Sequence, residues 1–321
     1  MVPGGANSAA RPPVLILAGP TGAGKTDWAI ELAERAPVEI VSVDSAMVYR
    51  GLDIGTAKPS PQLRARIAHH LIDLCDPAES YSAGRFVHDA LRAIGEIHAR
   101  GRAPLLVGGT LLYVRALLDG LATLPPAAPE LRRDLDARAA ALGWPALHAE
   151  LARLDPLAAA RISVNDSQRI QRALEVCYTT GEPISRLQRA TASPLAAFTV
   201  RYWLLEPERA VLKERIARRF DAMMAAGFLD EVRRLRDRGD LTAAHPSMRA
   251  VGYRQLWGHL EGRFSLEEGM RRAVVATRQL AKRQLTWMRA ERRAERVEPA
   301  SRASWNKDIC HSLAAVGSPG R

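Results

Sequence analysis

The chain has 321 residues, 47% of them hydrophobic, so it can bury one large core or two smaller ones. Lys and Arg outnumber Asp and Glu by 46 to 35, and the net charge of +11 favours polyanionic partners, nucleic acid above all. The three cysteines are far apart, with no Cys-x-x-Cys pair, which argues against a disulfide framework and a cysteine zinc site. No apolar run is long enough to span a membrane and residues 1–13 lack the apolar centre of a signal peptide, so we expect a cytoplasmic protein.

The first predicted elements surround a glycine-rich loop. Val14–Ala18 is a short apolar run typical of a buried strand, and Asp27–Arg35 is expected to be a helix. Between them, Gly19-Pro20-Thr21-Gly22-Ala23-Gly24-Lys25-Thr26 fits Gly-x-x-x-x-Gly-Lys-Ser/Thr, the phosphate-binding loop. Its backbone N–H groups and the following helix N-terminus attract a phosphate, Lys25 adds a charge, and the Thr26 hydroxyl can hold Mg²⁺. The flanking strand and helix argue against a chance glycine-rich turn, so we expect the chain to bind a di- or triphosphate.

Two more strands with polar ends follow. Val38–Val43 is rich in β-branched residues and ends at Asp44-Ser45, and Pro104–Val107 ends at Gly108-Gly109-Thr110. Between them, Ser82 is expected to cap a helix that runs to about Arg100. Strands that alternate with helices predict a parallel sheet, and ligands gather at the carboxyl ends of its strands. The phosphate loop and these two strand ends should therefore converge on one site.

The alternation stops at a proline-rich stretch, residues 124–129, after which residues 130–193 have the pattern of helices only. We interpret 123–196 as a helical insertion in an α/β core, the alternative being helices that simply pack on that core. Strand character returns at residues 198–205, and residues 207–296 are mostly helical. Residues 201–300 contain 22 Lys/Arg and 14 Asp/Glu, so this region carries +8 of the net +11 and is the expected polyanion face.

These patterns predict five segments along the chain. They are a disordered tail (1–12), the first part of the core (13–122), the helical insertion (123–196), the second and basic part of the core (197–298), and a second disordered tail (299–321).

The strand ends leave the role of Asp44 open. Most chains with a phosphate loop hydrolyse or transfer the terminal phosphate of a nucleoside triphosphate, and usually carry another strand that ends in an acid near Mg²⁺. Here Pro104–Val107 ends in glycines, and only Val38–Val43 ends in an acid. Asp44 is therefore either a magnesium-shell carboxylate or a base that acts on an acceptor, and spacing alone does not decide between them.

Several further blocks resemble the tRNA dimethylallyltransferases, also called isopentenyltransferases. The likeness runs in register from about Val14 to Arg289, and the C-terminal zinc-finger extension of eukaryotic members is absent, so the resemblance is to the bacterial form. The matching blocks are the phosphate loop, Val41–Pro59, Tyr81–Ala83, Leu106–Tyr113, Asn165-Asp166, Gln168-Arg169, Arg172–Val176, Val251–Gln255 and Thr277–Trp287. The resemblance implies an α/β fold: a P-loop NTPase-like parallel sheet flanked by helices, with an all-helical insertion domain that binds tRNA.

The activity that the resemblance implies is prenyl transfer to tRNA. The dimethylallyl group passes from dimethylallyl diphosphate to the N6 amine of the adenine just 3′ of the anticodon, in tRNAs that read codons beginning with U. Asp44 is the implied base, and Thr110 should lie near the acceptor or the bridging oxygen. The implied diphosphate ligands are Gly19, Thr21, Gly22, Ala23, Gly24, Lys25, Thr26 and Arg219, with Mg²⁺ held through Thr26.

The resemblance also implies a set of tRNA contacts. The adenine must leave its stack to reach the site, which calls for stacking groups and phosphate-binding cations. From the residues alone, 282–289 also fits a basic amphipathic helix with Trp287 in the core, and 168–172 also fits a solvated helix face. The implied contacts are Asp44, Ser45, Ala46, Met47, Arg132, Gln168, Arg169, Ile170, Gln171, Arg172, Arg249, Gly252, Tyr253, Arg254, Lys282, Arg283, Gln284, Trp287 and Arg289.

Three other functions fit the sequence less well than tRNA prenylation does. An adenylate isopentenyltransferase acts on free nucleotides and needs neither a helical insertion nor a basic C-terminal third. A small-molecule kinase that uses ATP lacks support, because no second strand ends in an acid. A non-catalytic RNA-binding module has no need for Lys25, Thr26, Asp44 and Thr110 together. No heptad or exposed apolar strand signals a dimer, so we expect a monomer whose partners are tRNA and dimethylallyl diphosphate.

Overall fold

A computed structural model of the chain describes residues 11–188 and 191–316. The chain divides into two compact units, one made of Met1–Leu118 with Pro194–Arg321 and the other of Asp119–Ser193. The predicted insertion, 123–196, therefore differs from the second unit by three or four residues at each end. The expected N-terminal tail lies mostly outside the described residues, but Pro12 is ordered because its carbonyl accepts a hydrogen bond from the amide of Thr199.

The first unit is built on a parallel sheet, as the sequence predicts. The strand order is β3-β2-β4-β1-β5-β6, and every pair of neighbours is parallel. Two strands were not predicted, β3 and β6, which have two and three residues and are too short to show a pattern. The strands are β1 (Pro13–Ala18), β2 (Val38–Val43), β3 (His69–His70), β4 (Ala103–Gly108), β5 (Thr199–Leu205) and β6 (Glu295–Val297).

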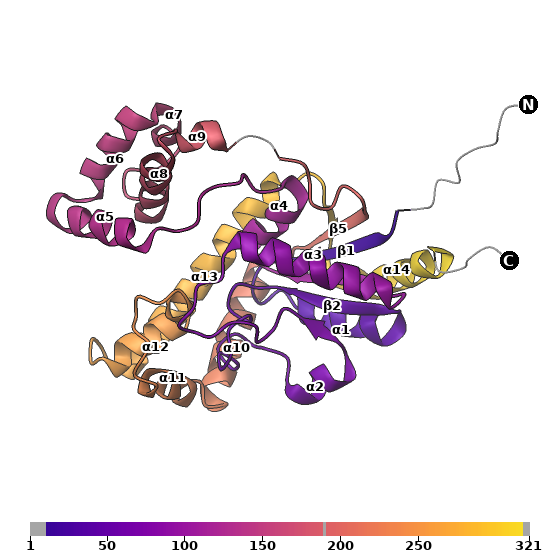
Figure 1. Ribbon diagram of the computed structural model, residues 1–321. Coiled ribbons are helices and arrows are strands. Elements are labelled where there is room, and N and C mark those ends of the chain that lie inside the picture. The colour runs from indigo at the N-terminus through magenta and orange to yellow at the C-terminus, as the bar shows by residue number, and fades with distance from the viewer. Residues whose placement is uncertain (1–10, 189–190, 317–321) are drawn as a thin grey trace, which may run out of the picture. The chain divides into compact units, whose positions relative to one another are not determined.

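Helices cover both faces of this sheet (Figure 1). Alternate residues of β1 point to opposite faces, so Ile16 packs with one layer of helices and Leu17 with the other. The layer on Ile16 contains α3 (Ala83–Ala99), α4 (Leu111–Asp119) and the C-terminal half of α13 (Leu266–Ala290), and the layer on Leu17 contains α1 (Lys25–Arg35) and α14 (Arg302–Val316). The predicted cap of α3 is confirmed, since Ser82 Oγ accepts a hydrogen bond from the Arg85 amide at 3.1 Å.

The expectation of a disordered tail from residue 299 is wrong for residues 299–316. They form a short 3₁₀ helix, Pro299–Ser301, and then α14. Trp305, Ile309 and Leu313 recur every four residues and are buried against the sheet. The indole of Trp305 lies 5.2 Å from that of Trp28 and 5.3 Å from that of Trp203, measured between ring centroids. This apolar stripe was overlooked because polar residues separate its members; residues 317–321 lie outside the described part.

Beside the sheet, the first unit has a second group of helices with its own apolar cluster. It contains α10 (Arg209–Ala225), α11 (Phe228–Asp237), a 3₁₀ turn (Ser247–Arg249), α12 (Tyr253–Leu260) and the N-terminal half of α13. Tyr49, Leu52 and Cys75 join this cluster from the connection that follows β2, which also includes α2 (Pro61–Arg66). The cluster therefore fixes the segment just after Asp44.

The second unit is helical throughout its regular structure, as predicted. Its helices are α5 (Pro129–Leu142), α6 (Trp144–Leu154), α7 (Pro156–Ala159), α8 (Ser167–Thr180) and α9 (Ile184–Leu187). They enclose an apolar core of their own, which includes Leu135, Leu151 and Leu174. A separate core is what distinguishes an inserted domain from helices that merely cover the sheet.

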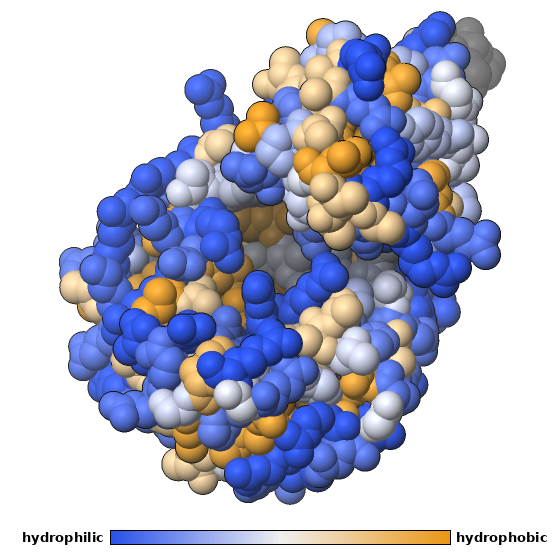
Figure 2. Space-filling view, turned by 90° about the vertical axis from the view of Figure 1, so that its left-hand side faces the viewer, coloured by the Kyte–Doolittle hydropathy of each residue, from blue (hydrophilic) through white to orange (hydrophobic). Residues whose placement is uncertain are grey.

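One face of the molecule shows how polar and apolar residues are distributed on its surface. In Figure 2, hydrophilic residues cover most of the visible face and apolar residues form separated patches. Among the described helices, none combines the length and hydropathy that a membrane span requires.

Candidate functional site

The carboxyl ends of three neighbouring strands open into one cavity of about 1170 Å³, lined entirely by the first unit. The phosphate loop, Asp44 and Thr110 all line it, so the expected convergence is observed. Seven cationic side chains stand against the carboxylates of Asp27 and Asp44, a balance that favours an anionic ligand. These cations are Lys25, Arg215, Arg218, Arg219, Arg249, Arg283 and Arg302.

The phosphate loop presents a group of free backbone amides. Gly22 and Gly24 have φ angles of 81° and 92°, in the left-handed region that favours glycine, and α1 begins directly after Gly24. The amides of Gly19 and Ala23 donate within the protein, to Gly108 O and Pro20 O. Among the described residues, by contrast, no acceptor meets the amides of Gly22, Gly24, Lys25 or Thr26. Four amides at one helix N-terminus form an anion-binding nest.

Lys25 lies beside this nest and is held by the loop itself. Its Nζ donates to Gly19 O at 2.8 Å and to Pro20 O at 2.9 Å. Burial lowers the pKa of Lys25 to about 8, while the nearby Asp44 carboxylate opposes that shift and Arg219 adds to it. An anionic ligand would favour the charged form of this amine.

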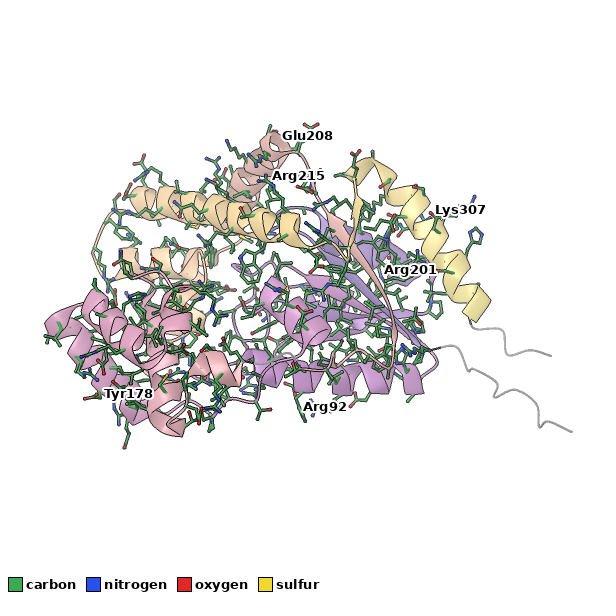
Figure 3. All side chains as sticks on the ribbon, turned by 90° about the horizontal axis from the view of Figure 1, so that it is seen from above. Arg92, Tyr178, Arg201, Glu208, Arg215 and Lys307 are labelled. Atoms are coloured by element: carbon green, nitrogen blue, oxygen red, sulfur yellow. The ribbon has the colours of Figure 1, made fainter. Side chains whose placement is uncertain are left out.

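Helix α10 brings two guanidinium groups to the same loop. Arg219 Nη2 donates to Thr21 Oγ1 at 3.3 Å, and Arg215 Nη1 approaches Ala23 O at 3.5 Å; Figure 3 shows Arg215 on α10. Desolvation lowers the pKa of Arg219, and the charge of Asp44 opposes this. Arg219 was expected here from the family resemblance, whereas Arg215 was not. Arg215 and Arg219 are four residues apart, so their side chains lie on the same face of α10. This spacing is the feature of the sequence from which Arg215 could have been predicted.

Asp44 is held by the chain that follows it. Its Oδ1 accepts hydrogen bonds from the amides of Ala46 at 2.8 Å and Met47 at 3.3 Å, while Oδ2 has no partner among the described residues. The amide of Ser45 donates to Thr110 Oγ1 at 3.1 Å, which ties the end of β2 to the end of β4. One oxygen of Asp44 is thus fixed and the other is available to a ligand.

The described residues contain no group of three or more His, Cys, Asp or Glu side chains suited to a metal ion. A protein hydroxyl is another oxygen ligand that a divalent cation can take. Thr26, exposed in the first turn of α1, offers a hydroxyl for that purpose.

The C-terminal half of α13 presents its polar face to the cavity. Ala281, Leu285 and Met288 are buried, whereas Trp287 has 40% of its surface exposed, so the interpretation that placed Trp287 in the core is wrong. Trp287 lines the cavity. The guanidinium carbon of Arg115 lies over the indole of Trp287, 5.4 Å from the ring centroid. Lys282, Arg283 and Arg289, which the resemblance implied as RNA contacts, are also exposed.

Tyr253 belongs to the cavity lining but points its side chain into the interior, and the expected RNA contact there stays a prediction. It is fully buried, and its hydroxyl donates to Glu231 Oε1 at 2.5 Å. Burial, with the charge of Glu231 beside it, raises the pKa of Tyr253 above its usual range. The same Glu231 carboxylate accepts the amides of Asp53, Ile54 and Gly55 at 2.7–3.2 Å. Glu231 was missed by the sequence analysis because an acid in the first turn of a helix is usually a surface residue.

Gly252, just before Tyr253, has a φ of 94° and faces Phe228, where a Cβ would come within 2.9 Å of the ring. Where Gly252 lines the cavity, the wall is therefore formed by its backbone. Arg249 is exposed and lines the cavity, whereas Arg254 is exposed on α12 outside the lining.

In the second unit, the implied RNA contacts divide into two groups. Arg132 donates to both oxygens of the buried Glu175, and Arg172 donates to Glu175 Oε2 and to Pro125 O. Burial opposes ionisation of Glu175, but these hydrogen bonds overcome it and lower the pKa to about 2. Both arginines thus have a structural role inside the unit.

The remaining implied contacts lie along α8. Ile170 is fully buried in the core of the unit, so its expected contact with RNA is wrong. Gln171 donates to Arg132 O and to Asp136 Oδ1. Gln168 and Arg169 are exposed, and Arg169 pairs with Asp166 at 2.9 Å.

Comparison with known proteins places this architecture in a family. The IPP transferase model matches residues 47–291, and the isopentenyl transferase model matches residues 12–72. The tRNA dimethylallyltransferase of Bordetella petrii is 61% identical over 282 residues, which cover 87% of this chain and 90% of that protein. The chain belongs to the tRNA dimethylallyltransferase family. The relative from Methylococcus capsulatus is 57% identical, with 91% of this chain and 94% of that one covered.

Solved structures agree with this membership. The tRNA isopentenylpyrophosphate transferase of Bacillus halodurans is 37% identical with a TM-score of 0.68, and the match covers 95% of this chain and 98% of that one. A eukaryotic dimethylallyltransferase described as acting on tRNA is 27% identical with a TM-score of 0.75, covering 95% and 78%. The P-loop NTPase-like fold is confirmed, and membership of the tRNA dimethylallyltransferase family favours neither the adenylate isopentenyltransferase nor the kinase interpretation.

Proposed function

We propose that the protein transfers the dimethylallyl group from dimethylallyl diphosphate to the N6 amine of the adenine 3′-adjacent to a tRNA anticodon and releases diphosphate. The observation that carries the proposal is one cavity that combines an anion nest with a carboxylate, Asp44, whose Oδ2 has no partner in the described part of the chain. Curated relatives that cover most of the chain are named tRNA dimethylallyltransferases, which supports this reaction.

The donor end of the site is suited to a departing diphosphate. As the bond from the dimethylallyl carbon to oxygen breaks, negative charge accumulates on the diphosphate. The free amides of the loop, Lys25 and Arg219 are positioned to stabilise that charge before the reaction begins. Mg²⁺, which prefers substrate phosphates, waters and one or two protein oxygens, would be held through the Thr26 hydroxyl and would neutralise part of the same charge.

The acceptor end is suited to an amine. The lone pair of an exocyclic adenine amine is delocalised into the ring, so the amine is a poor nucleophile. Asp44 takes a proton from N6 as the new carbon–nitrogen bond forms, and the free Oδ2 is the acceptor atom. Thr110 holds the Ser45 amide and so maintains the orientation of the segment that carries the base.

The RNA face combines cations with one aromatic ring. Arg249, Lys282, Arg283 and Arg289 are exposed, and Trp287 offers a ring on which an unstacked base can rest. The target adenine is extruded from the anticodon loop into the cavity. In the second unit, Gln168 and Arg169 are exposed for RNA contact. We further propose that the substrates are tRNAs that read codons beginning with U, and that the protein works as a cytoplasmic monomer.

A single assay tests this function. Unmodified tRNA is incubated with labelled dimethylallyl diphosphate and Mg²⁺, and the label is followed into the adenine next to the anticodon. AMP in place of tRNA tests the adenylate isopentenyltransferase function, and labelled ATP tests a kinase. Transfer to AMP but not to tRNA, or transfer of phosphate alone, would exclude the proposed reaction.

A further inference from the structure

Gln284 makes a bridge between two elements of the donor site. Its Oε1 accepts a hydrogen bond from the amide of Thr21 at 2.9 Å, and its Nε2 donates to Gly109 O at 2.8 Å. Thr21 lies in the phosphate loop after β1, and Gly109 follows β4, so one side chain of α13 joins both strand ends. The resemblance had grouped Gln284 with the RNA contacts of its helix.

The bridge supports the amide of Thr21, which has no acceptor within the phosphate loop itself. Pro20 has no N–H, and the amide of Ala23 closes the loop on Pro20 O at 3.2 Å. The Thr21 amide therefore has its only acceptor, within the described chain, in Gln284. The amides that follow form the anion nest, so their orientation depends on how the peptide of Thr21 is held.

The opposite end of the bridge is closely packed. A Cβ added to Gly109 would lie 2.5 Å from Gln284 Nε2 and 3.2 Å from Gly19 O. The absence of a side chain at Gly109 is what lets the amide of Gln284 approach this carbonyl. The neighbour of Gln284, Arg283, is exposed and lines the cavity, and within the described residues no hydrogen bond joins it to the loop.

We propose that Gln284 is a positioning residue for the diphosphate loop and not an RNA contact. It holds the loop in the conformation that binds the donor, and it does so from the helix that carries the RNA-facing residues Arg283 and Trp287. The proposal rests on the proposed function in one respect, that the ligand of the loop is dimethylallyl diphosphate.

Two substitutions on the same helix separate these roles. Gln284→Met keeps the length of the side chain but removes both hydrogen bonds. We expect it to raise the KM for dimethylallyl diphosphate by roughly fivefold to twentyfold, the effect of one or two lost hydrogen bonds, and to leave the Kd for an anticodon stem-loop unchanged. Lys282→Met is the matched control, because Lys282 is exposed on the same helix but does not line the cavity, and it should do the reverse, weakening the stem-loop without changing the donor KM.

Two further measurements make the test decisive. Gly109→Ala displaces the bridge from its other end and should raise the donor KM in the same direction as Gln284→Met. Binding of inorganic diphosphate, measured calorimetrically without RNA, should weaken in Gln284→Met and not in Lys282→Met. That measurement tests the bridge even if wild-type protein fails to prenylate tRNA, which would count against the proposed function alone. Loss of stem-loop affinity in Gln284→Met with unchanged diphosphate binding, or no change in either, would overturn the proposal.

Discussion

The hydroxyl of Tyr253 donates to Oε1 of Glu231 at 2.5 Å in the interior of the helical group beside the sheet. Glu231 also accepts three consecutive amides, those of Asp53, Ile54 and Gly55. Because Gly55 lines the cavity and Glu231 does not, this buried carboxylate shapes one wall of the site from behind the lining.

Replacing Tyr253 with Phe should lower the free energy of unfolding by about 1–3 kcal/mol, since one hydrogen bond to a charged group is lost. Affinity for tRNA should not change, because the ring is buried and the substitution keeps its packing. Chemical denaturation and a tRNA binding assay measure the two effects. A variant of normal stability with weakened tRNA binding would show that Tyr253 contacts the RNA.

Asp44→Asn should reduce prenyl transfer by roughly 10²–10⁴-fold, the usual contribution of a positioned base. The amide oxygen of Asn can still accept from the Ala46 and Met47 amides, so the local turn should persist. Single-turnover rates with saturating tRNA and donor measure the loss, and binding of both substrates serves as the control. A rate close to wild type would show that another group removes the N6 proton.

Donor binding should take up a proton at alkaline pH. Burial lowers the pKa of Lys25 to about 8 in the free protein, so at pH 9 most molecules carry a neutral amine there. The diphosphate favours the charged amine and raises its pKa, which draws in a proton on binding; at pH 6.5 Lys25 is already charged and contributes none. Calorimetry in buffers of different ionisation enthalpy counts these protons. Lys25→Met should abolish the uptake at pH 9, and equal uptake by wild type and variant would contradict the assignment.

Binding of tRNA should weaken steeply with salt, because cationic side chains release counterions from RNA. Removing the charge of Arg283 or Lys282 should reduce the slope of log K against log salt by roughly 0.7–0.9 per phosphate contact. Arg271, on the same helix but paired with Glu268 through two hydrogen bonds of 2.7 Å, is the matched control and should leave the slope unchanged. Equal slopes for all three variants would show that Lys282 and Arg283 of α13 do not contact tRNA phosphates.

Arg132→Ala should act on the stability of the helical unit rather than on RNA. Removing it takes two hydrogen bonds from the buried Glu175 and should cost about 1–3 kcal/mol, whereas Arg133→Ala should cost little because Arg133 is three-quarters exposed. The folded-state pKa of Glu175, about 2, lies below its ordinary 4.5. Its contribution is therefore complete above pH 4.5 and is lost as pH falls toward 2. Acid unfolding of the two variants measures the difference, and identical curves would refute the assigned role.

The sequence predicted the α/β core well because its signals are local. Strands of β-branched residues, the glycine-rich loop and the Ser82 cap each occupy a few consecutive positions. The wrong or missing predictions depend on the direction of a side chain or on partners far away in the sequence, and local patterns contain neither. Ile170 was grouped with Gln168 and Arg169 as one RNA-binding segment, although consecutive residues of a helix point in different directions and Ile170 faces the core. Glu231 and the bridge of Gln284 join residues more than 170 positions apart, and no periodicity reveals such partners.

The strand order has a consequence for synthesis on the ribosome. β1 lies in the interior of the sheet between β4 and β5, yet β5 follows the whole helical unit in the chain. Until residues 199–205 emerge, one edge of β1 has no partner strand, and an uncovered apolar edge is a site of misassembly. The helical unit, with its separate core, can fold during that interval. A pause in translation after the helical unit should therefore be more harmful to yield than one after the complete sheet.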